Sequence, residues 1–136
     1  MRKAPTQAMT VFGCFAKLCV VKCLLRLTSF RTTLRYCQGP TGSVVSEQWQ
    51  ANQEMVGDIV KNVTIAGTVF PGRARCLEQS LTLLACLRRR GVLAELRLGV
   101  RPYRFRAHAW VELDGVVLND DPQQLAGMAV LPPVTV

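Results

Sequence analysis

Three residue types that can act together as a nucleophile, a base and an acid occur in the second half of this chain. Cys76 opens an apolar run with helical spacing, and His108, the only histidine, lies in a strand-like run. Two carboxylates, Asp120 and Asp121, follow just beyond an expected hairpin turn. In a thiol triad the base deprotonates the cysteine, while the acid fixes the tautomer of the base and stabilises its charged form. These residues therefore predict nucleophilic thiol chemistry.

The position of Cys76 favours this use. A cysteine in the first turn of a helix faces the positive end of the helix dipole and unpaired backbone N–H groups, and both stabilise a thiolate. The same N–H groups can form part of an oxyanion hole, and Pro71-Gly72 allow a sharp turn into the helix. The alternative role of a free cysteine is to pack in the core as a small hydrophobic residue. Cys86, deep in the same helix, fits that alternative.

The strand around His108 has two different faces. His108 alternates with Trp110 and Glu112 on one face. The other face is apolar and consists of Ala107, Ala109, Val111 and Leu113. We expect the apolar face to pack on the core and the face with His108 to line a cleft.

The sequence leaves the identity of the acid open. A two-residue Asp114-Gly115 loop would pair Leu113 with Val116 and place Asp121 on the His108 face. A three-residue loop with a bulge would reverse the parity and bring Asp120 there instead.

Hydrophobic periodicity predicts helices first and strands later. The predicted helices are one helix or two short ones over 10–37, a helix of weaker periodicity over 44–63, and the Cys helix over 75–90. The predicted strands are 95–100, 107–113 and 116–118, and residues 123–136 are interpreted as a tail or cover. The fold class is therefore α+β, with a Cys helix packed on a small antiparallel sheet. We expect a helical region at 1–66 that packs on a catalytic core at 67–136, in one compact domain overall.

Charge and cysteine content limit which partners and cofactors we expect. The chain has 136 residues, a net charge of +8 and a pI near 9.7, which favours an acidic partner such as nucleic acid, an anionic membrane or an acidic peptide. Because no nucleic-acid-binding motif is present, we expect no nucleic acid. The six cysteines fit neither a disulfide framework nor a zinc or iron–sulfur pattern. We therefore expect free thiols in a reducing cytoplasm, with no metal and no cofactor.

Residues 10–37 combine apolar and cationic side chains. Lys17, Lys22 and Arg26 interrupt the apolar run, which argues against both a signal peptide and a transmembrane helix. The cationic residues of this segment are Lys17, Lys22, Arg26, Arg31 and Arg35. We interpret the segment as a docking surface for a partner or for peripheral membrane contact. The alternative is a helix that simply covers the core.

Five segments of the second half, taken in order, resemble the lasso-peptide biosynthesis B proteins. They are Cys76-Leu77-Glu78-Gln79-Ser80-Leu81, Leu87-Arg88-Arg89-Arg90-Gly91, Leu98-Gly99-Val100, Phe105-Arg106-Ala107-His108-Ala109-Trp110-Val111-Glu112 and Asn119-Asp120-Asp121-Pro122. The resemblance covers about 70–122 and implies a papain/transglutaminase-like cysteine protease that removes the leader from a lasso precursor peptide. It places the triad on Cys76, His108 and Asp120, and so implies a bulged or longer hairpin loop. Gln79 departs from the family, where an arginine is often found at this position.

The resemblance also implies partners. These are the precursor peptide with its leader and core, a separate leader-recognition protein, and an ATP-dependent, asparagine-synthetase-like lasso cyclase. Because residues 1–65 look helical and offer no β-hairpin, we expect the stand-alone protease form of the family. Two other functions remain open: acyl transfer to an amine, as in transglutaminases or arylamine acetyltransferases, and a non-catalytic peptide-binding scaffold.

Overall fold

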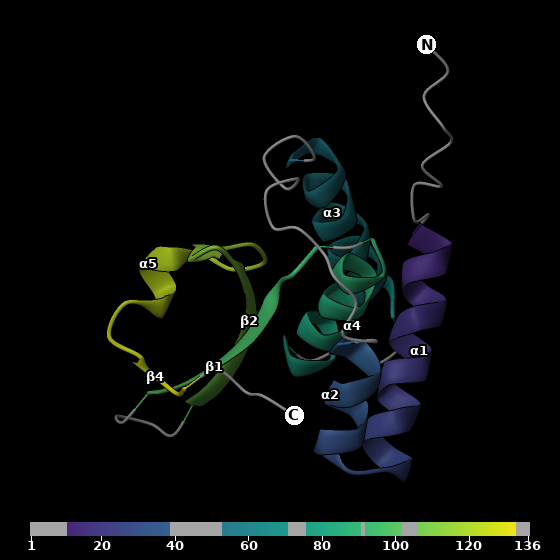
Figure 1. Cartoon of the computed structure of the whole chain (residues 1–136), viewed down its shortest axis with the longest axis horizontal. Coiled ribbons are helices and arrows are strands. Elements are labelled where there is room, and N and C mark those ends of the chain that lie inside the picture. The colour runs from purple at the N-terminus through teal and green to yellow at the C-terminus, as the bar shows by residue number, and fades with distance from the viewer. Residues whose placement is uncertain (1–10, 39–52, 71–75, 91, 102–105, 133–136) are drawn as a thin grey trace.

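The computed structural model describes residues 11–38, 53–70, 76–90, 92–101 and 106–132. Its four longer helices are α1 (Val11–Leu27), α2 (Phe30–Gln38), α3 (Gln53–Val69) and α4 (Cys76–Arg89). Figure 1 shows these helices gathered on one side of the molecule, with a curved sheet on the other side. The α+β architecture predicted from the sequence is confirmed.

The sheet is small and antiparallel. Its strands are β1 (Glu95–Arg101), β2 (Arg106–Leu113), β3 (Val116–Val117) and β4 (Ala129–Val130), in the spatial order β3-β2-β1-β4. A short helix, α5 (Pro122–Leu125), lies between β3 and β4 in the chain. Leu98 pairs with Ala109 and Leu96 with Val111, so these apolar side chains share one face.

Helix α4 is the centre of the core. It contacts α1, α2 and α3 as well as β1 and β2, and every residue from Ser80 to Leu87 is buried. A helix that is covered on all sides needs apolar residues all round, and the leucines of α4 supply them. The hydroxyl of Thr82, which is buried with them, donates to the carbonyl of Glu78 at 2.8 Å.

The structure adds a strand and resolves one open alternative. The predicted helical segment over 10–37 is two helices, and the hydroxyl of Ser29 accepts the backbone N–H of Thr32 at 3.2 Å at the start of the second. Helix α3 ends later than predicted, and the part of the prediction at 44–52 lies outside the described residues. The interpretation of 123–136 as only a tail or cover is wrong, because β4 pairs with β1. A two-residue strand is too short to show a period.

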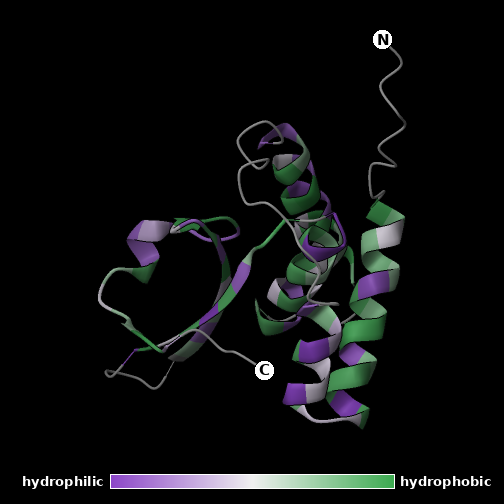
Figure 2. Ribbon diagram, in the orientation of Figure 1, coloured by the Kyte–Doolittle hydropathy of each residue, from purple (hydrophilic) through white to green (hydrophobic). Residues whose placement is uncertain are grey.

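The predicted cationic surface is smaller than expected. Lys17 is buried, and its ammonium group donates to the hydroxyl of Tyr36 at 3.5 Å. Lys22 lies over the ring of Phe70, with its ammonium group 4.7 Å from the ring centroid. Both lysines therefore have packing roles inside the helical half, whereas Arg26, Arg31 and Arg35 are exposed. In Figure 2, α1 is mainly hydrophobic, and its exposed apolar side chains include Phe12, Val20 and Leu27. Within the described ranges, none of the helices has the length and apolar character needed to span a membrane.

Candidate active site

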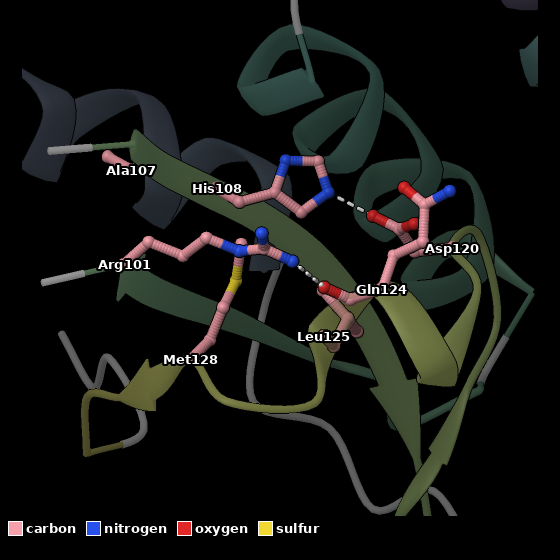
Figure 3. Close-up of a pocket in the computed structure, with 7 residues that line it drawn as sticks. All are labelled: Arg101, Ala107, His108, Asp120, Gln124, Leu125 and Met128. Carbon is pink, nitrogen blue, oxygen red and sulfur yellow. Dashed lines mark hydrogen bonds and ion pairs between the residues drawn. The ribbon is translucent and has the colours of Figure 1, made fainter. Parts of the chain in front are cut away.

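His108 and Asp120 form a hydrogen-bonded pair. The Nε2 atom of His108 bonds to Oδ2 of Asp120 (Figure 3), and both side chains are half-buried. The second carboxylate oxygen, Oδ1, accepts the backbone N–H of Asp121 at 2.7 Å. With Nε2 engaged by the carboxylate, Nδ1 is the ring nitrogen that can exchange a proton with a nucleophile.

The hairpin that leads to Asp120 has the tight turn, not the bulged one. Asp114 and Gly115 have φ values of 49° and 79°, and Leu113 pairs with Val116, which is a two-residue turn with positive φ at both central positions. The longer loop implied by the resemblance is therefore wrong. Asp120 nevertheless reaches His108, because the regular ladder ends early.

The ladder ends where a side chain replaces a backbone carbonyl. The N–H of Leu118 still donates to the carbonyl of Val111 at 2.9 Å. The return bond from the N–H of Val111 goes to Oδ1 of Asn119 at 2.8 Å. Beyond Leu118 the chain no longer follows the pleat of the sheet, so the alternation rule does not fix which aspartate faces His108.

Asp121 has a different role. It is the N-cap of α5, and its side chain accepts the backbone N–H of Gln123 at 3.0 Å. Pro122 follows at the first helical position, where its missing N–H costs nothing. Asp121 is exposed, and the role of its carboxylate is to stabilise the start of a short helix.

Cys76 is the first residue of α4 and is half-buried. Helix α4 packs on β2, the strand that carries His108. Among the described residues, the Cys76 thiol forms no hydrogen bond with His108. The structure thus joins two of the three predicted site residues by a hydrogen bond and places the third at the start of the adjacent helix. Hydrogen bonds to a nucleophile often tighten only in the complex with substrate.

Two further polar residues connect the same three elements, and sequence reasoning missed their role. The hydroxyl of Ser80, in α4, donates to the carbonyl of Ala109 at 3.0 Å. The side-chain amide of Asn119 donates to that hydroxyl at 3.0 Å. Ser80 is fully buried. A serine beside the apolar face of a core helix was the available signal, because a buried hydroxyl requires a partner.

The face of β2 that carries His108 is only partly a cleft. Trp110 is buried, with its ring centroid 6.2 Å from that of His108. Its indole N–H donates to Glu112 at 2.9 Å, and Arg97 pairs with Glu112 at 3.7 Å. A Cβ added to Gly99 would lie 2.8 Å from the Trp110 ring, so the close approach of this ring requires glycine. Trp110 therefore packs beside His108 as a buried residue and does not line the cavity beside the His108–Asp120 pair.

A cavity of about 210 Å³ opens beside the His108–Asp120 pair. Its remaining lining residues are Arg101, Ala107, Gln124, Leu125 and Met128, drawn in Figure 3. Arg101 donates to the backbone carbonyl of Gln124 at 2.7 Å, which ties β1 to α5. The cavity thus combines apolar walls with a cation, and it borders two of the candidate site residues.

Three other cysteines are buried at the junction of the helices. They are Cys14, Cys37 and Cys86. Burial raises the pKa of Cys37 to about 12, against the opposing effect of Lys17 and Arg89. A hydrogen bond between the other two thiols lowers the pKa of Cys14 and raises that of Cys86. In the part of the chain that is described, no cluster of three or more His, Cys, Asp or Glu side chains could hold a metal ion.

Comparison with known proteins bears on the family of the chain. The profile of the Transglutaminase-like superfamily matches residues 18–132. The Microcin J25-processing protein McjB of Escherichia coli is 31% identical over 84 residues, which cover 61% of this chain and 40% of that protein. The chain therefore matches less than half the length of this relative. No solved structure matches the chain. Both matches support the resemblance to the lasso-peptide biosynthesis B proteins, and the extent of the profile match shows that the chain belongs to the transglutaminase-like superfamily.

Proposed function

We propose that the protein is a cysteine endopeptidase that removes the leader from a lasso-peptide precursor. The observation that carries the proposal is the hydrogen bond between His108 and Asp120, on a strand packed against the helix that Cys76 opens. This is the base–acid half of a thiol triad. The processing role stated in the name of the relative supports the choice of a peptide substrate.

In the proposed reaction, Nδ1 of His108 takes the proton of the Cys76 thiol. The thiolate then attacks the carbonyl carbon of the last leader residue. The backbone N–H groups at the start of α4 stabilise the resulting oxyanion. The His108 proton passes to the leaving amine, the C–N bond breaks, and a thioester remains on Cys76. A water molecule that gives its proton to His108 attacks the thioester. The C–S bond then breaks, the proton returns from His108 to the sulfur of Cys76, and the leader is released as a carboxylic acid.

Asp120 would hold His108 in the tautomer that this reaction needs. A carboxylate that accepts from Nε2–H leaves Nδ1 as the basic nitrogen, and it stabilises the imidazolium that forms after proton transfer. The cavity beside the pair is large enough for one side chain of an extended peptide. It therefore suits a linear leader segment better than a folded product.

Acyl transfer to an amine is a second candidate, favoured by the superfamily to which the chain belongs. It uses the same thioester, but an amine attacks the thioester in place of water. Mass spectrometry separates the two reactions, because hydrolysis yields a leader with a free carboxylate, whereas transfer yields a leader amide whose mass depends on the amine supplied.

The test compares two cysteines of the same helix. We expect Cys76→Ala to reduce leader removal to the background rate, because only the nucleophile is lost. Cys86→Ala should lower stability by about 1–2 kcal/mol, since it leaves a small cavity in the core, and should retain most of the activity. Cleavage of a synthetic precursor is followed by mass spectrometry. Loss of cleavage in Cys86→Ala but not in Cys76→Ala would exclude the proposed nucleophile.

We further propose that a separate recognition protein binds the leader and that a lasso cyclase uses the released core. The described residues that precede α4 lie mainly in helices that pack on α4. An extended leader, in contrast, is commonly bound by adding a strand to a sheet edge. Cleavage is measured at low precursor concentration with and without a recognition protein. Full-rate cleavage by this chain alone would contradict delegated binding.

A further inference from the structure

We propose that Ser80 and Asn119 are positioning residues that hold the nucleophile, the base and the acid in their working arrangement. The inference rests on the proposed function for the reaction itself. Its geometric basis is independent and consists of three hydrogen bonds among buried or half-buried groups.

The two residues complete an edge of the sheet that the backbone leaves open. Strand β3 has only two residues, and the bond from the N–H of Leu118 to the carbonyl of Val111 is the last backbone bond of its ladder with β2. Two polar groups of β2 lie beyond this point on the same edge, namely the N–H of Val111 and the carbonyl of Ala109. Asn119 accepts from the first at 2.8 Å, and Ser80 donates to the second at 3.0 Å.

These bonds join the three elements that carry the proposed triad. Ser80 lies one turn after Cys76 on the same side of α4. Ala109 directly follows His108 on β2, and Asn119 directly precedes Asp120. The bond between Asn119 and Ser80, at 3.0 Å, closes the connection. A shift of any one element relative to the other two would break at least one of these bonds.

The donor and acceptor pattern of the connection is fully determined. The hydroxyl of Ser80 gives its only proton to Ala109, so it must accept from Asn119. The amide nitrogen of Asn119 is then the donor, and its oxygen faces the N–H of Val111. Because Ser80 is fully buried, removal of one partner leaves polar groups without a replacement from water.

The single histidine of the chain gives a direct readout of this role. In long-range ¹H–¹⁵N correlation spectra, the two ring nitrogens of His108 report its tautomer without interference from another histidine. We expect the native protein to show the form protonated at Nε2. In Asn119→Ala and Ser80→Ala we expect a mixture of tautomers, together with a fall in kcat of at least about tenfold. Ser80→Thr keeps the hydroxyl and should restore the native spectrum.

Thr82→Val is the matched control. It removes another fully buried hydroxyl of α4, one that bonds to Glu78 within the same helix and not to β2. The control should lose stability as Ser80→Ala does, yet keep the native His108 spectrum and kcat. A change of equal size in this control would show that the spectra report general loosening, and would overturn the proposal.

The remaining outcomes separate this proposal from the proposed function. A folded Asn119→Ala with the native His108 spectrum and kcat within about twofold would overturn the positioning role. If Asn119→Ala does not fold, Ser80→Ala decides by the same criteria, because it removes a single oxygen atom. If the spectra change as expected but the native protein cleaves no precursor, the positioning role stands and the proposed function fails.

Discussion

Neighbouring residues of the same type have different roles in this site. Asp120 bonds to His108, whereas Asp121 caps α5. The sequence placed both within reach of His108 but could not choose between them from strand parity, because parity holds only as far as the ladder continues. The resemblance named Asp120 for another reason, and the structure supplies the physical one, the side chain of Asn119 that ends the ladder.

The two aspartates therefore predict opposite mutational outcomes. Asp120→Asn should lower kcat by about 100-fold or more, because an amide no longer fixes the tautomer of His108 or stabilises its charge. Asp121→Asn should change kcat little, since asparagine caps a helix about as well as aspartate. Steady-state cleavage of a precursor by both variants checks the ranking. The reverse ranking would identify Asp121 as the functional acid.

Among the elements, long periodic segments could be predicted and short ones could not. The helix over 75–90 and the strands over 95–100 and 107–113 agree with α4, β1 and β2 to within a residue or so. The segment that contains α5 and β4 carries too few residues for a periodic pattern. A local cap at Asp121 and Pro122 starts α5, and pairing with β1 defines β4. That segment supplies Gln124, Leu125 and Met128 to the cavity, so part of the candidate site was outside the reach of the sequence.

The cavity assignment is tested by filling it from this segment. Met128→Trp adds bulk beside His108 and should raise KM for a peptide substrate, while kcat at saturation falls less, because the triad itself is unchanged. Gln123→Trp adds the same side chain at an exposed position of α5 that does not line the cavity, and should leave KM unaltered. Equal KM values for both variants and the native protein would show that substrate does not occupy this cavity.

In the molecule as a whole, the helical half encloses three of the thiols that the site does not use, whereas Cys23 is exposed. The three buried thiols are Cys14 from α1, Cys37 from α2 and Cys86 from α4, so these cysteines are core residues. The charge of Lys17 could not be placed in advance, because an amphipathic pattern does not show that an aromatic hydroxyl will receive a buried ammonium group. From this junction we expect the stability of the protein to fall at alkaline pH.

The raised pKa of Cys37 predicts how stability changes above neutral pH. The unfolded chain loses this thiol proton near its ordinary pKa of 9.0, whereas the folded protein retains it up to a pKa of about 12. Between these values the folded state binds more protons, so stability that is complete below pH 9 is lost as pH rises towards 12. By about pH 11 the loss from this group should be about 3 kcal/mol. Urea unfolding at about pH 8 and pH 11 measures this loss of stability.

Two variants test whether the Cys37 thiol is responsible. Cys37→Ala should show a smaller loss than the native protein, even though it starts from lower stability. Cys23→Ala, which changes an exposed cysteine, should keep the full loss. An identical pH dependence in all three proteins would mean that the Cys37 thiol is not the group responsible.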